Sequence, residues 1–287
     1  ARGLCPAVTG QIPVGAGRKM AKPRPSAEAG TVPGSSQSTL TSEVPMSTIN
    51  HEAVARRLTR ERLRTYLAAS DGDLERALAL YDWNARVGGA LHEDIGRLEV
   101  VFRNAIDEAL LVYGAAQGWP TAWYQRRELF PGKHGARALD DIKTARVRAT
   151  RRGVAEVHGK VIAELSFGFW RFLCTTPYLT SLWVPALGDA FPNHPDHGDP
   201  RAVRQAVDDR IQRVHFLRNR VAHYEPVHHR NLRRDLESIT QLTGWISADT
   251  QAWIVGASRT ARVIKDHPNS GEYDLRTPRP SPPGLPR

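Results

Sequence analysis

The fold of this chain is decided by the stretch LHEDIGRLEVVFRNAIDEAL, residues 91–110. Apolar side chains recur in it at every third or fourth position, which places them on one face of an α-helix. A helix with one continuous apolar stripe buries that stripe against neighbouring helices. The stretch therefore predicts the central helix of a helical bundle. Its stripe consists of Leu91, Ile95, Leu98, Phe102, Ile106 and Leu110.

The segments before this helix also carry helical signals. Asn50 is a capping residue for a predicted helix over residues 50–67. The Asp-Gly-Asp turn at residues 71–73 starts the helix that leads into the central stripe. Within that helix, Gly88-Gly89 predicts a break or a bend.

The segments after the central helix continue the helical pattern. Asp199-Pro200, a capping Asp before a Pro in the first turn, predicts the start of a long helix that runs to about Tyr224. No segment shows the sustained alternation of a strand, so the predicted fold class is all-α. Further helices are predicted over residues 136–152, 161–173, 231–247 and 250–265.

Composition divides the chain into three parts. Residues 1–45 are rich in Pro, Gly, Ser and Thr and lack periodic apolar positions, which predicts a disordered N-terminal extension. The helical pattern begins just after Met46, so the extension is either part of the protein or sequence upstream of its start. Residues 47–267 form the predicted helical domain, and residues 268–287 a disordered Pro-rich tail.

The net charge indicates which class of partner the protein binds, and the cysteine content indicates its cellular compartment. The formal net charge is +10 and the isoelectric point is about 10.0. Such a basic surface favours a polyanion, and nucleic acid is the commonest one. Only Cys5 and Cys174 are present, which is typical of a reducing cytoplasm. The sequence lacks an apolar run long enough to span a bilayer, so no membrane partner is expected.

The stretch that carries chemistry is RVHFLRNRVAHYEP, residues 213–226. On a helical wheel with Val203 at zero, one apolar stripe falls within about 80° of zero and consists of Val207, Ile211, Val214, Leu217 and Val221. Arg218 falls at about 60°, inside the stripe, whereas Asn219 and His223 fall at about 160° and 200°, on the opposite side.

This divergence has two consequences. A guanidinium directed toward a core needs acceptors, and the sequence offers Glu99 and Glu164 for Arg218. Arg218 and His223 converge only if the helix distorts near its end or if two chains meet, and Phe216 would suit an interface between chains. From the spacing alone, the alternative is a solvated helix end, where His223 interacts only with the helix dipole.

Residues 218–226, RNRVAHYEP, resemble the RxxxxH motif of HEPN-domain ribonucleases. More narrowly, they resemble the Abi-like (abortive infection) branch of that superfamily. Arg218, Asn219 and His223 fill the catalytic positions of the motif. Tyr224 departs from the pattern, because the family often has a second His there, and this puts a role for the neighbouring position in doubt.

Two other segments agree with the resemblance and extend it over residues 81–239. LExxxRN begins at Leu98 in the central helix, and ELSFGFW begins at Glu164. The residues expected to support the site are Glu99, Arg103, Asn104, Glu164, Tyr224 and Glu225.

The resemblance implies a HEPN-like helical bundle with additional helices that forms a homodimer with the motif at the dimer cleft. It implies an endoribonuclease of toxin or phage-defence type, with RNA as substrate, a cognate antitoxin as a further partner and no metal or other cofactor. Some members of the family only bind RNA. The alternatives are therefore a non-catalytic RNA-binding or sensing module and a dimeric scaffold of a defence system.

The chemistry expected of these residues needs no metal. His223 would take the proton of a ribose 2′-OH, since histidine titrates near neutrality. Arg218 would hold the scissile phosphate through its planar fork, and Asn219 would orient His223 or the phosphate. The expected products are a 2′,3′-cyclic phosphate and a 5′-hydroxyl.

Basic residues outside the motif are candidates for contacts with the RNA backbone. Apart from Arg220, they lie on the predicted helix over residues 136–152, where a solvated charged face is the equal alternative. The candidates are Arg146, Arg148, Arg151, Arg152 and Arg220.

Other motifs favour structural roles. The histidine pairs at 194–197 and 228–229 lack a Cys or a second spaced pair to complete a zinc set, so no metal site is predicted. Trp119, Trp123 and Tyr124 lie among apolar neighbours, which favours packing over stacking on bases.

Overall fold

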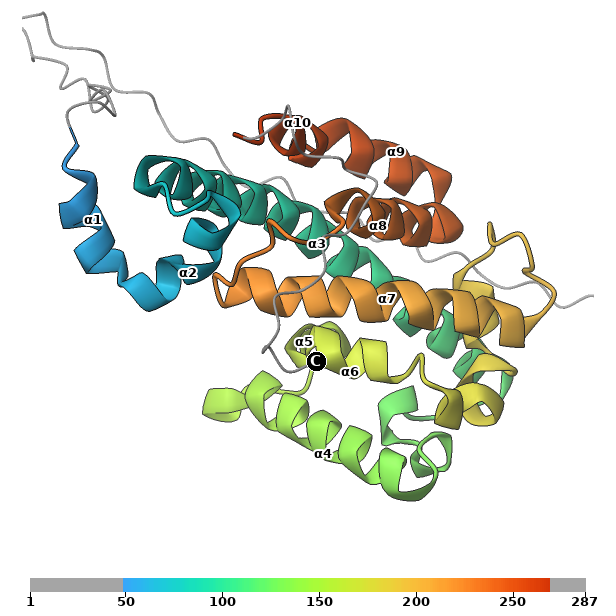
Figure 1. Ribbon diagram of the computed structural model, residues 1–287. Helices are drawn as coiled ribbons and strands as arrows, with labels where there is room; N and C mark the ends of the chain where they lie inside the picture. Colours follow the sequence, from blue (N-terminus) through green and yellow to red (C-terminus); the bar gives the residue numbers. More distant parts are fainter. Residues whose placement is uncertain (1–48, 269–287) are drawn as a thin grey trace, which may run out of the picture. The chain divides into compact units, whose positions relative to one another are not determined.

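The computed structural model describes residues 49–268. The predicted extension over residues 1–45 lies outside this part, as does all but the first residue of the predicted tail. The described part is helical and contains no strand, which confirms the predicted fold class (Figure 1). Its α-helices are α1 (His51–Leu58), α2 (Arg60–Ala69), α3 (Leu74–Ala116), α4 (Gly132–Ala149), α5 (His158–Glu164), α6 (Phe167–Phe172), α7 (Pro200–Ala222), α8 (Leu232–Ile246), α9 (Ala248–Ala257) and α10 (Thr260–Lys265).

Helix α3 is the centre of the bundle. Its predicted stripe from Leu91 to Leu110 is buried throughout, and its faces contact α1, α2, α7, α8 and α10. The helix begins at the predicted place, because the Asp73 side chain accepts a hydrogen bond from the Arg76 N–H at 3.0 Å. It then runs on through Gly88 and Gly89. The predicted break at the two glycines is therefore wrong.

Helix α7 lies along α3 and carries the motif. The Asp199 carboxylate caps it by accepting from the backbone N–H groups of Arg201 and Ala202, which confirms the predicted start. In Figure 1, α4, α5 and α6 lie on one side of α7, and α8 and α9 on the other. The contacts agree, since α6 and α8 both pack on α7. The C-terminal end of α7 lies on the same side of the unit as α2 (Figure 1).

Three predicted helices are each divided in two. Thr59, with a φ of 70°, separates α1 from α2. Ser166 accepts a hydrogen bond from the Phe169 N–H and so starts α6 afresh after α5. The third division falls between α9 and α10, at Ser258 and Arg259. Apolar periodicity continues across each of these positions, which is why the pattern alone predicts one helix.

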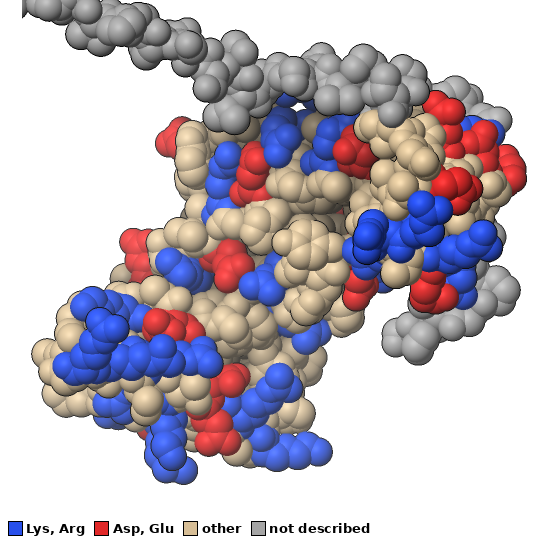
Figure 2. All heavy atoms as spheres, turned by 90° about the vertical axis from the view of Figure 1, so that its left-hand side faces the viewer, with Lys and Arg blue, Asp and Glu red and all other residues tan. Residues whose placement is uncertain are grey.

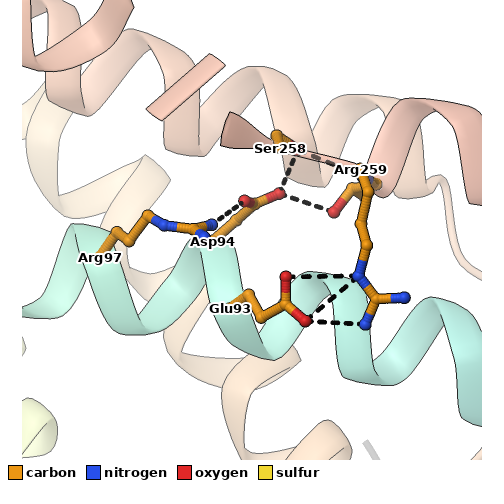
Figure 3. A network of polar contacts seen from close by, with 6 residues as sticks. Glu93, Asp94, Arg97, Ser258 and Arg259 are labelled. Atoms are coloured by element: carbon orange, nitrogen blue, oxygen red, sulfur yellow. Dashed lines mark hydrogen bonds and ion pairs between the residues drawn. The ribbon is translucent and has the colours of Figure 1, made fainter. Parts of the chain in front are cut away.

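A buried carboxylate fixes the α9–α10 junction to α3 (Figure 3). Asp94 is 1% exposed. It accepts hydrogen bonds from the Ser258 and Thr260 hydroxyls, each at 2.6 Å, and from Arg97 at 3.0 Å. The preceding residue, Glu93, forms an exposed ion pair with Arg259 at 2.7 Å. Asp94 thus joins the α9–α10 junction to α3 through two hydrogen bonds from hydroxyl groups.

Among the described residues, no helix combines the length and the apolar character needed to cross a membrane.

Candidate active site

The C-terminal end of α7 is closed by a left-handed residue. Tyr224 has a φ of 54°. Its N–H donates to the Val221 carbonyl at 3.0 Å, and the Glu225 N–H donates to the Arg220 carbonyl at 2.8 Å. This is the Schellman arrangement, which usually has Gly at the left-handed position. For a residue with a side chain, such as Tyr224, the left-handed conformation costs about 1–2 kcal/mol. The helix therefore ends at Ala222, with His223 as its C-cap.

The loop that follows is held by three polar side chains. Arg62 of α2 donates to the Tyr224 carbonyl. Arg220 donates to the Pro226 carbonyl through Nε at 3.2 Å and Nη2 at 2.9 Å. The Asn84 Oδ1 atom of α3 accepts from the Val227 N–H at 2.7 Å. The end of α7 is thereby fixed against both α2 and α3.

This arrangement gives Arg220 a structural role in addition to the predicted RNA contact. Its guanidinium is directed to the Pro226 carbonyl and pairs with Glu225 at 3.5 Å. Burial lowers the pKa of Arg220 from its usual value. Because its donors are already used within its own chain, we assign Arg220 to shaping the loop.

Asn219 and His223 lie away from the apolar stripe of α7, as the helical wheel predicts. His223 is exposed at the helix end, and Asn219 is half-buried. Tyr224, next to His223, is 79% exposed. Within residues 49–268, neither the imidazole of His223 nor the amide of Asn219 forms a hydrogen bond to the protein. Both side chains are thus available to a ligand.

Arg218 lacks the predicted carboxylate partner. Neither Glu99 nor Glu164 forms an ion pair with it in the described part of the chain, and Glu164 is exposed at the end of α5. The predicted pairing is therefore wrong. The Nε atom of Arg218 is buried and has no hydrogen-bond partner among the described residues. Unsatisfied donors of this kind are costly, so an acceptor supplied by a ligand would be bound favourably.

His215 is a neighbour of Arg218 that the sequence interpretation missed. Burial lowers its pKa, and the positive charges of Arg171 and Arg218 lower it further. Its ring lies 5.9 Å from that of Phe167 at the start of α6. His215 precedes Arg218 by three positions, and residues so spaced are neighbours on a helix. That spacing was the available signal.

The predicted supporting residues on α3 and α5 are not joined to the motif by polar contacts. Asn104 and Glu164 are exposed, whereas Glu99 and Arg103 are half-buried. The Nε atom of Arg103 is also buried without a partner in the described part of the chain. The structure brings none of the four into hydrogen-bond distance of the motif residues within residues 49–268.

Asp107, one turn after Arg103, has a clearer role. It accepts from the Trp123 indole N–H at 2.6 Å and pairs with His158 at 2.9 Å. Trp123 and Tyr124 are buried, and Trp119 packs against Tyr113. These contacts confirm that the three aromatic residues pack within the protein.

A pocket of about 440 Å³ opens beside the loop at the end of α7, and we call it the α7-end pocket. Its wall comes from α2, α3, the last turn of α7 and the loop. Two predicted supporting residues take part, whereas the catalytic candidates do not. The wall includes Arg62, Asn84, Gly88, His92, Tyr224 and Glu225.

Two groups of basic side chains lie on the face that contains α1 and α2. Figure 2 shows Lys and Arg gathered over the lower part of this face, at the height of α4 in Figure 1, and again at the height of α1 and α2. Mostly uncharged residues, with scattered charges of both signs, lie between the two groups (Figure 2). The α4 group comprises the exposed residues Lys143, Arg148, Arg151 and Arg152, and the α1–α2 group comprises Arg56, Arg57, Arg60 and Arg64.

The basic residues predicted to contact RNA differ in their exposure. Arg148, Arg151 and Arg152 are exposed, whereas Arg146 is half-buried and pairs with Glu156 at 2.7 Å. The α1–α2 group was not predicted, because its arginines alternate with acidic and apolar residues along the sequence. Only the fold places them on one surface.

The histidine pairs at 194–197 and 228–229 each include a residue that packs within the protein. The His194 Nδ1 atom accepts from the Asp196 N–H at 3.0 Å, and its ring contacts Trp245. His228 packs on Tyr66, with ring centroids 4.9 Å apart. Among the described residues, no three His, Cys, Asp or Glu side chains lie close enough to hold one metal ion.

Stability is expected to fall as the pH is lowered from 7 toward 4. Burial, followed by the charges of Arg220 and Arg230, lowers the pKa of His229 from 6.5 to about 4. Between these values the unfolded chain binds a proton that the folded chain does not, so the free energy of unfolding rises with pH across this window. Urea denaturation of the wild type and His229→Gln at pH 5 and pH 7 checks this. The variant should lose less stability on acidification, and equal losses would refute the assignment.

Comparison with known proteins gives no family: no family model, no curated protein and no solved structure matches the chain.

Proposed function

We propose that the chain is a metal-independent endoribonuclease of toxin or phage-defence type, built on a HEPN-like helical bundle. The observation that carries the proposal is the end of α7. There an exposed His223 and a half-buried Asn219 have no polar partner in the described part of the chain, on a helix that also holds Arg218 with a buried, unsatisfied Nε. RNA is proposed as the substrate because of the two basic groups and because of the resemblance of the motif.

The reaction uses the nucleophile of the substrate. His223 removes the proton of a ribose 2′-OH, and the resulting oxygen attacks the adjacent phosphorus. The bond from phosphorus to the 5′-oxygen breaks, and that oxygen receives a proton from a second His223 or from water. Arg218 stabilises the negative charge that develops on the phosphate oxygens. The products are a 2′,3′-cyclic phosphate and a 5′-hydroxyl.

The site we propose is assembled from two copies of the chain. The side chains of Arg218 and His223 do not meet within one copy, since the Nε atom of Arg218 is buried and His223 is exposed. Phe216 is 56% exposed and Tyr224 is 79% exposed, and both flank the motif. Pairing α7 with its symmetry mate would cover these rings and bring one copy's His223 toward the other copy's motif.

The proposal is tested by incubating the purified chain with a mixed RNA pool in EDTA and analysing the ends of the products. Cyclic phosphate and 5′-hydroxyl ends are expected, and RNA with 2′-deoxy sugars should bind without being cut. Binding of RNA without cleavage would instead favour the non-catalytic RNA-binding module.

Removal of charge from the α4 group is expected to weaken RNA binding and its salt dependence. For single-stranded RNA, each phosphate that the protein no longer neutralises lowers the slope of log K against log salt by about 0.7, so Arg148→Ala/Arg151→Ala should lower it by about 1.4. Fluorescence titration of RNA at several salt concentrations measures the slope. The charge-matched control is Arg262→Ala/Lys265→Ala, at exposed positions of α10. Equal slopes for the two double variants would exclude the α4 group as an RNA contact.

A further inference from the structure

Two glycines occupy the interior of α3 without a packing reason within the protein. A glycine inside a helix costs about 1 kcal/mol relative to alanine. A Cβ atom added at Gly88 would meet no atom within 4 Å, and one at Gly89 would lie 3.6 Å from Arg259, an ordinary contact. Both glycines line the α7-end pocket. Gly88 therefore leaves open space in the wall of the pocket.

The wall of the same pocket includes a mostly buried side chain with an unused donor. Asn84 is 7% exposed. Its Oδ1 atom accepts from the Val227 N–H at 2.7 Å, which directs its amide nitrogen away from that contact. Within residues 49–268 this amide nitrogen donates to no protein atom. The amide oxygen has its hydrogen bond and the amide nitrogen has none to the protein, so this side chain favours a ligand that carries an acceptor.

Aromatic and acceptor groups complete the wall. Tyr81 is fixed by an edge-to-face contact with Tyr66, at 5.2 Å between ring centroids. Tyr224 is largely exposed at the mouth of the pocket. The Glu225 carboxylate pairs with Arg220 at 3.5 Å and is still 46% exposed, so it can accept a further hydrogen bond. The pocket thus combines flat apolar surface, one donor and one acceptor.

We propose that the α7-end pocket binds a nucleobase of the RNA next to the scissile phosphate, an inference that rests on the proposed ribonuclease function. A base can lie flat over the backbone at Gly88 and Gly89, stack on a tyrosine, accept from Asn84 and donate to Glu225. Single-stranded RNA is commonly recognised through such stacking and edge contacts. The volume of about 440 Å³ lies within the range of small-molecule sites.

The charges of the wall favour a base over a phosphate. Arg62 is the arginine of the pocket wall, and its guanidinium already donates to the Tyr224 carbonyl. Glu225 places a carboxylate in the same wall, and a phosphate there would be repelled. His92 also lines the pocket, on the turn of α3 that follows the glycines. A neutral ring with a donor and an acceptor on its edge suits this environment.

The experiment fills the pocket without disturbing the helix. Gly88→Leu places a side chain in the open space, and Gly96→Leu makes the same change at an exposed position of α3 where a Cβ atom also meets nothing within 4 Å. Leucine is the better helix former at both positions, so both variants should keep the thermal stability of the wild type. Calorimetric titration with AMP, GMP, CMP and UMP measures the pocket directly.

Gly88→Leu is expected to weaken mononucleotide binding by at least about tenfold, and Gly96→Leu to leave it unchanged. Asn84→Asp keeps the acceptor for the Val227 N–H and removes the donor, so it should also weaken binding by about tenfold. If all forms bind no mononucleotide, or if Gly88→Leu binds as the wild type does, the inference is overturned.

A second measurement separates a base of the RNA from a free nucleotide. A short 2′-O-methyl RNA should compete with the mononucleotide, and Gly88→Leu should change the bases found at the cut. Mononucleotide binding without competition by RNA would overturn the proposed subsite in favour of an effector site. A third outcome is that the chain cleaves no RNA but binds mononucleotides in a way that depends on Gly88. That result would support the base site and refute the proposed ribonuclease function.

Discussion

His223→Ala is expected to lower the rate of RNA cleavage by about 10²–10⁴-fold, the usual effect of losing a general acid or base. The imidazole is exposed, has no hydrogen-bond partner in the described part of the chain and follows directly on the last turn of α7. Its removal therefore leaves the packing of the bundle unchanged. Single-turnover cleavage of a labelled RNA measures the rate, and a gel-shift titration should show that the affinity for RNA is retained.

The matched control for this variant is His197→Ala, which removes another exposed histidine from the connection before α7. It should cleave at the rate of the wild type. A solvated helix end would give a different pattern, since removing a charge–dipole interaction costs about 0.3–1 kcal/mol of stability and leaves the rate untouched. Cleavage at the same rate by both alanine variants would therefore refute the catalytic role of His223.

Arg218→Lys extends this test to the phosphate-binding group. Lysine keeps the charge but loses the planar fork and the buried Nε donor. We expect a lower rate of cleavage with little change in stability, because Arg218 forms no ion pair within the described residues.

Asp94→Ala is expected to lower the free energy of unfolding by about 3 kcal/mol. The carboxylate is 1% exposed and accepts from two hydroxyls and one guanidinium. Its removal leaves the buried Thr260 hydroxyl and the half-buried Ser258 hydroxyl and Arg97 guanidinium without this acceptor. For a domain of this size the loss corresponds to a fall in melting temperature of roughly 10 °C. Urea denaturation followed by circular dichroism measures it.

The adjacent residue provides the control. Glu93→Ala removes an ion pair with Arg259 in which both side chains are 42% exposed, and exposed pairs contribute about 0–1 kcal/mol. The two variants differ by one position on the same helix and both remove one carboxylate. If Asp94→Ala lost no more stability than Glu93→Ala, the buried network of Figure 3 would not fix the α9–α10 junction.

The sequence predicts the helices well where periodicity and capping agree. The stripe of α3 and the Asp199 cap of α7 both follow from local chemistry, namely the helical repeat and the unsatisfied N–H groups at a helix start. The divisions at Thr59, Ser166 and Ser258 were missed because periodicity identifies the buried face and not the point at which tertiary contacts interrupt a helix. The prediction at Gly88-Gly89 was wrong for the opposite reason. The buried residues Val87 and Ala90, which flank the two glycines, pack in the core and sustain the helix despite the low helix propensity of glycine.

The position of the candidate site along the chain could be predicted from the sequence. The groups that contact each of its side chains could not. Periodicity correctly separates the direction of Arg218 from that of His223. It does not show which groups distant in the sequence approach each side chain. The Pro226 carbonyl as the acceptor for Arg220, the missing carboxylate at Arg218, and the contact of His215 with α6 all depend on the packing of whole helices.

The loop after α7 is held by side chains that also line a pocket. Arg62 and Asn84 each contact the loop backbone, and each forms part of the wall of the α7-end pocket. Occupancy of the pocket and order in the loop are therefore linked equilibria, and each must favour the other by the same factor. A chain that binds its ligand in this way would place His223 most firmly when a substrate is present.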